Sequence, residues 1–179
     1  MEPIEVNGDT FVIYITEEQI MKRISELAKQ INDDYKGKTP IFISVLNGSF
    51  IFCADLFRQI TIGCEIDFIK VSSYGNSKTT SGNTKLLKEL NCTIKDRDII
   101  IVEDIVDTGI CINFIHHLIK SNDPASLKIV TLLQKEKDVK LDCSLDYVGF
   151  KIPDKFVLGY GLDYAQKARN LKSIYVIQQ

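Results

Sequence analysis

One stretch, Asp98–Gly109, constrains the fold more than any other part of the chain. It begins with four consecutive branched apolar residues, Ile99 to Val102, which are typical of a strand buried on both faces. The run gives way to three acids and a turn: Glu103, Asp104, Asp107, Thr108 and Gly109. The apolar-rich stretch over 110–119 then has the length of a helix. The sequence therefore predicts a buried strand, an acidic loop and a helix N-terminus in direct succession.

This succession indicates a ligand site at one edge of a sheet. Open α/β sheets bind ligands at the carboxyl ends of their strands, and the N-terminus of a helix offers unpaired N–H groups to a phosphate. Acidic side chains beside a phosphate would repel it. A divalent cation between the acids and the ligand, bound directly or through water, removes that conflict. The stretch therefore predicts an anion site with a metal beside it.

The rest of the chain alternates strand-like and helix-like segments. A hairpin-like pair over 4–15 precedes a helix that opens with a capping box at Thr16 and Gln19 and fades near 33–34. Further segments are strands over 41–46, 65–71 and 126–133, and a helix over 50–60 that packs through Ile51, Ala54 and Phe57. This alternation predicts an α/β fold, with a mostly parallel sheet and helices on both faces.

Two segments depart from that pattern. The polar stretch over 72–84 contains Gly75 and Gly82 and is typical of a functional lid or a disordered loop. The last third has little helix and short strands at 147–150, 156–160 and 174–177. We expect a single domain, with a core over about 17–145 and a small hood from about 1–15 and 147–179 that covers the carboxyl edge of the sheet.

Composition argues against several classes of function. A net charge of −2 gives no support for broad nucleic-acid or membrane binding. No apolar run approaches the ~20 residues that span a bilayer, and an N-terminus with Glu2 and Glu5 does not resemble a secretory signal. The five cysteines are an odd number without a Cys-x-x-Cys pair, which favours free thiols in a reducing compartment. We therefore expect a cytoplasmic protein.

The central stretch also carries a family resemblance. Val102–Gly109 resembles the phosphoribosyl diphosphate signature of the type I phosphoribosyltransferases, with a hydrophobic strand, two acids, two spacers and Asp-Thr-Gly. Val45–Phe50, Ser72–Gly75 and Val148–Tyr164 narrow the resemblance to the hypoxanthine (hypoxanthine-guanine) phosphoribosyltransferases. The resemblance is in order and covers nearly the whole chain. It implies the type I phosphoribosyltransferase fold, a mostly parallel twisted sheet flanked by helices with a small hood subdomain.

The resemblance implies an enzyme of purine salvage. The reaction would be Mg²⁺-dependent transfer of the 5-phosphoribosyl group from 5-phospho-α-D-ribose 1-diphosphate to hypoxanthine and, as a further base, guanine. Its products would be IMP or GMP and diphosphate. Asp107 matches the family's candidate proton acceptor at purine N7 and is the implied catalytic residue.

Several positions match the family's phosphoribosyl diphosphate site: Leu46, Asn47, Gly48, Ser73, Tyr74, Glu103, Asp104, Asp107, Thr108, Gly109, Ile110, Cys111 and Arg169. The first three form a diphosphate loop that in members of this family can contain a cis peptide. Ser73 and Tyr74 match a lid that keeps water from the ribosyl centre. The turn 107–111 would hold the 5′-phosphate through N–H groups and the Thr108 hydroxyl. The implied metal ligands are Glu103, Asp104 and Asp163.

On the purine side the resemblance implies four residues: Lys135, Lys155, Phe156 and Val157. Lys135 would donate a hydrogen bond to the 6-oxo group, which selects hypoxanthine or guanine over adenine. Phe156 would stack on the purine ring. Backbone groups of Val157 and Lys155 would face the edge of the base.

The chain departs from the family pattern at two positions. Cys111 stands where many relatives carry Thr or Ser, and a thiol is a weaker donor than a hydroxyl. Asn47 stands where some relatives carry lysine, which removes one positive charge near the leaving group. We expect weaker 5′-phosphate binding or more reliance on backbone N–H groups, with the reaction itself unchanged.

Two alternatives stay open. One is a non-catalytic regulator that keeps the phosphoribosyl diphosphate site as a sensor; such proteins commonly add a nucleic-acid surface, and this chain has no spare domain and no basic stripe. The other is a phosphoribosyltransferase for xanthine or another base, because recognition at the purine 2-position relies on backbone geometry. The family also suggests a homodimer or homotetramer that acts on small molecules.

Overall fold

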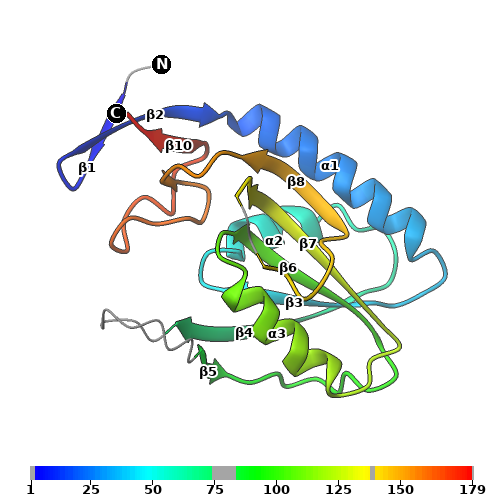
Figure 1. The fold of residues 1–179 in the computed structure, drawn as a ribbon. Coiled ribbons are helices and arrows are strands. Elements are labelled where there is room, and N and C mark those ends of the chain that lie inside the picture. Colours follow the sequence, from blue (N-terminus) through cyan, green and yellow to red (C-terminus); the bar gives the residue numbers. More distant parts are fainter. Residues whose placement is uncertain (1–2, 74–83, 138–139, 179) are drawn as a thin grey trace.

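The computed structural model describes residues 3–73, 84–137 and 140–178, which form two sheets and three helices (Figure 1). In chain order the elements are β1 (Ile4–Val6), β2 (Asp9–Ile15), α1 (Glu17–Asp34), β3 (Ile41–Leu46), α2 (Phe50–Phe57), β4 (Glu65–Ser73), β5 (Thr84–Lys88), β6 (Asp98–Val106), α3 (Ile110–Lys120), β7 (Ser126–Lys135), β8 (Tyr147–Ile152), β9 (Val157–Leu158) and β10 (Ile174–Ile177). None of the described helices is long and apolar enough to cross a bilayer.

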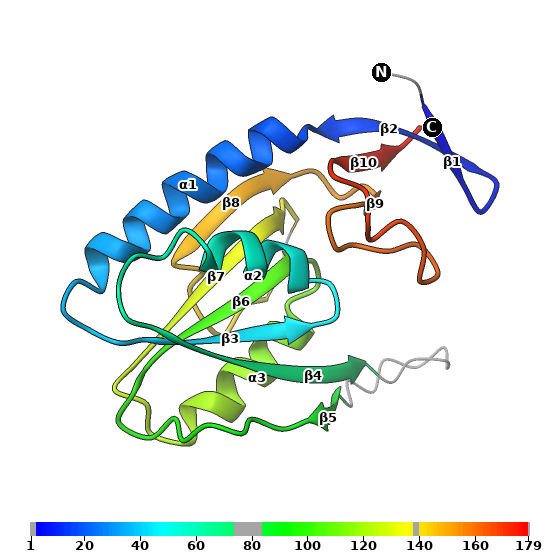
Figure 2. The ribbon, with the colours of Figure 1, turned by 180° about the vertical axis from the view of Figure 1, so that it is seen from behind.

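The larger sheet has the strand order β5-β4-β3-β6-β7-β8. All its neighbouring strands are parallel except β5, which runs antiparallel to β4. Side chains of β6 alternate between two cores: Ile100 and Val102 pack with α1 and α2, whereas Ile99 and Ile101 pack with α3. Figures 1 and 2 show α3 on one face of this sheet and the other two helices on the opposite face. The predicted α/β fold class is thus confirmed.

Helix α1 follows directly from its sequence signals. The Thr16 hydroxyl accepts from the Gln19 N–H while the Gln19 side chain accepts from the Thr16 N–H, so the expected capping box is present. One face of the helix is buried against the sheet, through Ile20, Ile24, Leu27, Ala28 and Ile31. This spacing of three and four residues is the apolar stripe that the sequence predicts.

The smaller sheet is antiparallel, with the order β1-β2-β10-β9, and is built from both ends of the chain. It lies at the end of the molecule toward which the core strands point (Figure 2). The expected boundary of the hood at 147 is wrong, because β8 pairs in parallel with β7 and completes the larger sheet. Gly149 permits this pairing to be close, since a Cβ there would lie 2.4 Å from the Leu132 carbonyl oxygen.

Two further expectations differ from the structure. Helix α2 ends at Phe57 rather than near residue 60, and its most buried residues are Phe52, Cys53 and Leu56. Ile51 and Phe57 pack against the core as expected, whereas Ala54 is exposed. In so short a helix the two bulky apolar residues Phe52 and Leu56, one turn apart, decide which face is buried. The end of the predicted polar loop belongs to a strand, β5, and its start belongs to β4. The rest of that loop, with the predicted lid residue Tyr74, lies outside the described residues.

Asp67 is a buried acid of β4, away from the predicted site. Its carboxylate accepts hydrogen bonds from the N–H groups of Phe68, Asn91 and Cys92 and from the Lys88 ammonium. Burial raises the pKa of this carboxyl, but the hydrogen bonds outweigh it and lower the pKa to about 2. Because this is below the usual value of about 3.9 in an unfolded chain, the carboxylate stabilises the fold above pH ~4 and loses that effect as the pH falls toward 2.

We therefore expect Asp67→Asn to lower the free energy of unfolding at pH 7 by roughly 2 kcal/mol. The difference in the free energy of unfolding between variant and wild type should narrow as the pH falls to ~3, because the Asp67 carboxyl of the unfolded wild-type chain becomes protonated below its usual pKa of about 3.9 while that of the folded chain is still ionised. Urea denaturation at both pH values measures this, with Asp33→Asn on the exposed end of α1 as the matched control. An equal difference at both pH values would contradict the account.

Candidate active site

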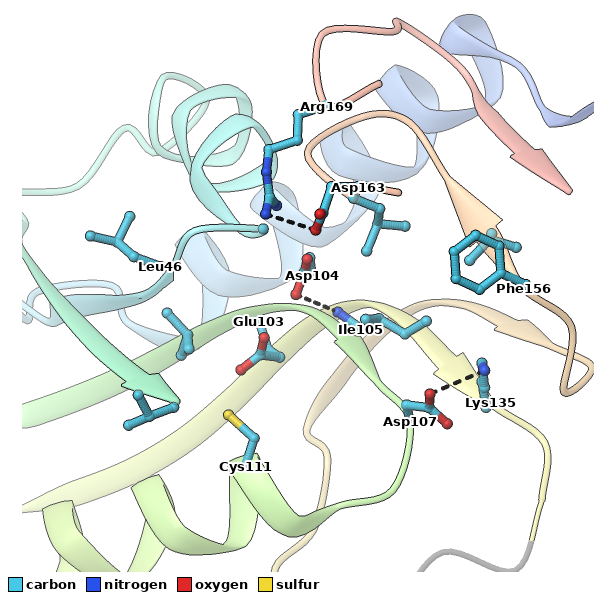
Figure 3. Close-up of a pocket in the computed structure, with 15 residues that line it drawn as sticks. Leu46, Glu103, Asp104, Ile105, Asp107, Cys111, Lys135, Phe156, Asp163 and Arg169 are labelled. Carbon is cyan, nitrogen blue, oxygen red and sulfur yellow. Dashed lines mark hydrogen bonds and ion pairs between the residues drawn. The ribbon is translucent and has the colours of Figure 1, made fainter. Parts of the chain in front are cut away.

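A cavity of about 480 Å³ opens where the carboxyl ends of β3, β6 and β7 approach the smaller sheet (Figure 3). Its lining residues are Val45, Leu46, Gly48, Val71, Glu103, Asp104, Ile105, Asp107, Cys111, Lys135, Phe156, Val157, Leu162, Asp163 and Arg169. Residues that are far apart in the sequence meet here because parallel strands end at the same edge of the sheet. Most of the expected site residues thus line this one cavity, and the predicted phosphate turn lines a second, smaller one.

Glu103 and Asp104 form the acidic floor of the cavity. They lie inside β6 rather than in a loop after it, because β6 continues to pair with β7 as far as Val106. Their side chains are only 6% and 8% exposed. Burial raises the pKa of both carboxyls, that of Glu103 most strongly, and the charge of Asp104 raises the Glu103 pKa further. Two such neighbouring buried acids favour a cation or hydroxyl groups as their ligand.

The loop after β3 contacts this floor through Gly48. A Cβ on Gly48 would lie 1.6 Å from Oδ2 of Asp104, so no side chain fits at this position. A Cβ on Gly161 would likewise lie 2.1 Å from the Gly48 carbonyl oxygen. The peptide bond between Leu46 and Asn47 is cis, as the resemblance implies for the diphosphate loop. The loop therefore brings backbone groups next to the acidic floor.

We expect Gly48→Ala to raise the KM for phosphoribosyl diphosphate about tenfold, because the methyl group must displace the Asp104 carboxylate at the 1–3 kcal/mol typical of overpacking. Steady-state kinetics at saturating base would measure this. Gly63→Ala is the matched control, since its Cβ would meet nothing closer than 3.6 Å. If the two variants have the same KM, the contact with Asp104 has no functional role.

Arg169 and Asp163 lie on the opposite side of the cavity from α3 (Figure 3). The Arg169 guanidinium contacts the Asp163 carboxylate at 2.7 Å and donates to the Gly161 carbonyl oxygen at 2.8 Å. The other Asp163 oxygen accepts from the Gln166 N–H. Asp163, predicted as a metal ligand, is therefore an ion-pair partner of Arg169 in this structure.

The predicted phosphate turn surrounds a second, smaller cavity of about 80 Å³, which Thr108, Gly109 and Cys111 line together with β6 residues. Gly109 stands directly before α3 with a φ of 80°, a conformation that favours glycine. The turn thus presents the N-terminus of α3, where backbone N–H groups lack helical partners. Burial and then the nearby charges of Glu103 and Asp104 raise the pKa of Cys111, so it is a neutral thiol.

At the end of the cavity where the resemblance implies purine binding, the end of β7 approaches the loop after β6. The Lys135 ammonium lies 3.1 Å from Oδ2 of Asp107 and 2.9 Å from Oδ1 of Asp154. Lys137 contacts Oδ1 of Asp107 and lies 3.1 Å from Asp154. Burial raises the pKa of Asp107, but the ammonium groups of Lys137 and Lys135 outweigh it and hold the pKa below the usual value.

Phe156 forms an apolar wall beside these charges. Its ring is 44% exposed and lies 5.2 Å from the Tyr164 ring and 6.1 Å from the Phe11 ring, measured between centroids. Val157 is buried next to it in β9. A partly exposed aromatic ring that two other rings contact is suited to stacking against a flat ligand.

Not every predicted residue lines the two cavities. Asn47, Ile110 and Lys155 do not, and Tyr74 lies outside the described residues, as does the side chain of Ser73. Sequence analysis missed the apolar lining residues Val45, Val71, Ile105 and Leu162, and the charged pair Lys137 and Asp154. Apart from Leu162, which lies between β9 and β10, their only sequence signal is their place at or just beyond the ends of strands, which is shared with many residues that line nothing.

The acidic floor fits a Mg²⁺ ion. Oε2 of Glu103 is buried without a hydrogen-bond partner among the described residues, and Asp104 supplies a second buried carboxylate. The described residues contain no group of three potential ligand side chains. Mg²⁺ commonly keeps several waters and is bound by one or two carboxylates together with substrate phosphates, so two acids suffice.

Comparisons with known proteins agree with this geometry. Residues 14–165 match the family model described as the phosphoribosyl transferase domain. The chain is 44% identical to the hypoxanthine-guanine phosphoribosyltransferase of Bacillus subtilis (strain 168) over 166 residues, which covers 93% of this chain and 92% of that protein. It is 38% identical over 173 residues to the bifunctional protein TilS/HprT of Listeria monocytogenes (serotype 4b). This match covers 97% of this chain but only 27% of that protein's length.

Solved structures support the same assignment. A crystal structure of a hypoxanthine-guanine phosphoribosyltransferase from Bacillus anthracis superposes with a TM-score of 0.88 at 44% identity, and covers 93% of this chain and 98% of that chain. The family model spans most of the chain, and the relatives match it over nearly its full length. The resemblance that the motifs carry is thus confirmed. The chain belongs to the phosphoribosyltransferase family and is a transferase enzyme.

Proposed function

We propose that this enzyme transfers the 5-phosphoribosyl group from 5-phospho-α-D-ribose 1-diphosphate to hypoxanthine and to guanine, with IMP or GMP and diphosphate as products. It would act in purine salvage. The observation that carries the proposal is the two-sided cavity: Lys135, Asp107 and Phe156 stand at one end, and the acidic floor, the Gly48 loop and Arg169 at the other. Relatives named hypoxanthine-guanine phosphoribosyltransferase support the choice of base.

The purine end suits a 6-oxopurine. Lys135 is a pure hydrogen-bond donor, so it matches the 6-oxo group of hypoxanthine and guanine and leaves the 6-amino group of adenine without an acceptor. Phe156 stacks on the ring. Asp107 accepts the proton from N7 while N9 forms its bond to C1 of the ribose; the electron pair of the breaking C1–O bond leaves with the diphosphate.

The other end suits the charged substrate. N–H groups at the start of α3 and the Thr108 hydroxyl bind the 5′-phosphate, and the Gly48 loop and Arg169 bind the diphosphate. Glu103 and Asp104 would hold Mg²⁺ and face the ribose hydroxyls. When bound, the ion offsets the negative charge that develops on the leaving diphosphate. Asp163, which contacts Arg169 in this structure, would help to hold a second ion.

Assembly and location rest on the family resemblance. We propose a homodimer or homotetramer in the cytoplasm, with small molecules as its substrates and no role for nucleic acid or a membrane. A net charge of −2 supports the last point. Analytical ultracentrifugation of the purified chain distinguishes the assemblies by mass.

The test is a base panel. The protein is incubated with phosphoribosyl diphosphate, Mg²⁺ and, separately, hypoxanthine, guanine, xanthine or adenine, and nucleotides are quantified by chromatography. We expect IMP and GMP, little product from adenine, and loss of product when EDTA removes the metal. Preference for xanthine would replace the proposed substrate, and full activity in EDTA would remove the metal from the proposal.

A further inference from the structure

Four charged side chains form a closed ring at the purine end of the cavity. Asp107, Lys135, Asp154 and Lys137 alternate in charge, and each carboxylate contacts both ammonium groups. They lie at the carboxyl ends of three neighbouring parallel strands. Asp107 is in the loop after β6, Lys135 is the last residue of β7 with Lys137 in the turn beyond it, and Asp154 is in the loop after β8. The proposed function uses only Asp107 and Lys135, so the other two residues need an explanation.

The two oxygens of Asp107 have different partners. Lys135 contacts Oδ2, whereas Lys137 contacts Oδ1. A purine that takes the Lys135 ammonium with its 6-oxo group would therefore free Oδ2 and leave Oδ1 in its contact with Lys137. The freed oxygen is the one available for the proton at N7. Lys135 in turn keeps a partner, because Asp154 lies 2.9 Å from its ammonium.

We propose that Lys137 is a positioning residue for the reaction: it holds Oδ1 of Asp107, keeps that carboxylate charged, and turns Oδ2 toward the purine. Asp154 contacts both Lys137 and Lys135, so that the two ammonium groups are held between the carboxylates of Asp107 and Asp154. This inference rests on the proposed role of Asp107. Neither Lys137 nor Asp154 touches the reacting atoms in this account.

Charge supports the assignment. Among the described residues, the groups that face Asp107 from the adjoining elements are the two lysines, with Asp154 behind them and the buried acids Glu103 and Asp104 elsewhere along the cavity. Of the lysines, Lys135 must turn to the base during each turnover. Lys137 is then the cation that remains beside Asp107. Without it, the carboxylate would stand in a cavity that already holds two buried acids.

The first experiment follows Asp107 without any substrate. Carbon-detected NMR of protein labelled at the Asp carboxyl carbons gives its titration midpoint, and the resonance missing from Asp107→Asn identifies it. In Lys137→Met, which keeps the length but removes the charge, the midpoint should rise by about one pH unit. Lys137→Arg should return it toward the wild-type value. An unchanged midpoint in Lys137→Met would overturn the inference.

The second experiment follows turnover. The acidic limb of the kcat profile for hypoxanthine should move to higher pH by the same amount in Lys137→Met and be restored in Lys137→Arg. Lys151→Met, which removes an exposed lysine of β8 without an ion pair among the described residues, is the matched control. An equal movement in this control would reduce the effect to general surface charge and overturn the inference. Failure of the base panel in wild type would refute the proposed function, while the NMR titration would still test the contact itself.

Discussion

Asp107→Asn is expected to lower kcat with hypoxanthine by a factor of about 100 to 10,000, which is the usual contribution of a positioned acid or base. An amide has nearly the same shape as the carboxylate but cannot take the proton from N7. Because Asp107 is partly exposed and lies outside the two cores, the variant should fold normally. Circular dichroism and a thermal melt verify the fold, and initial rates at saturating substrates give kcat.

The low pKa of Asp107 also predicts in which direction the turnover rate changes with pH. Lys137 and Lys135 outweigh burial and hold the Asp107 pKa below its usual value, so the carboxylate is charged and ready to accept a proton at neutral pH. The wild-type rate should therefore fall only as the pH drops through that low pKa, below the usual range for an aspartate. Asp142→Asn, an exposed acid near α3, is the control. Near-normal turnover of Asp107→Asn would remove the residue from its proposed role.

Lys135→Ala is expected to reduce the preference for 6-oxopurines. The lost hydrogen bond from a charged donor corresponds to about 1.5–3 kcal/mol, so kcat/KM for hypoxanthine should fall by a factor of roughly 10 to 150. The value for adenine, which offers no acceptor at position 6, should change much less. The measurement is the ratio of kcat/KM for the two bases in variant and wild type.

The ion pairs of Lys135 mean that effects on Asp107 must be separated from effects on base recognition. In the absence of a base its ammonium is shared between Asp107 and Asp154, so a variant that lacks it leaves Asp107 with Lys137 as its ion-pair partner among the residues that the structure describes. A change in kcat alone would report on Asp107, whereas a change in the ratio of the bases reports on recognition. Lys120→Ala, at the exposed end of α3, is the control. If the ratio of the two bases is unchanged, Lys135 does not select the base.

The sequence predicted the central strand and helix well for a physical reason. Four branched apolar residues such as Ile99 to Val102 can hardly be placed anywhere but in a strand buried on both faces. The glycine after Thr108 and the apolar stretch beyond it define where the helix begins. The acids were harder to place, because pairing of β6 with β7 continues through Glu103 and Asp104. Residue type alone does not say where such a ladder ends.

At the proposed purine end of the cavity, the roles of several residues could not be predicted from their own sequence context. Lys135 and Phe156 could be named only through the family resemblance, since a single lysine after a strand is most often a solvated charge. Lys137 and Asp154 stayed out of reach because their role arises from the meeting of three loops. The predicted boundary of the hood differs from the structure for a similar reason. The short segment Tyr147–Ile152 becomes part of the larger sheet only through its parallel partner β7.

The central claim is that one cavity joins a 6-oxopurine to phosphoribose and releases diphosphate. The most direct test is the stoichiometry of the wild-type reaction with hypoxanthine, phosphoribosyl diphosphate and Mg²⁺, with IMP and diphosphate measured in the same samples. The account predicts equal amounts of IMP formed, diphosphate released and hypoxanthine consumed, and no diphosphate when the base is omitted. Diphosphate released without IMP, or no product from any base, would contradict it.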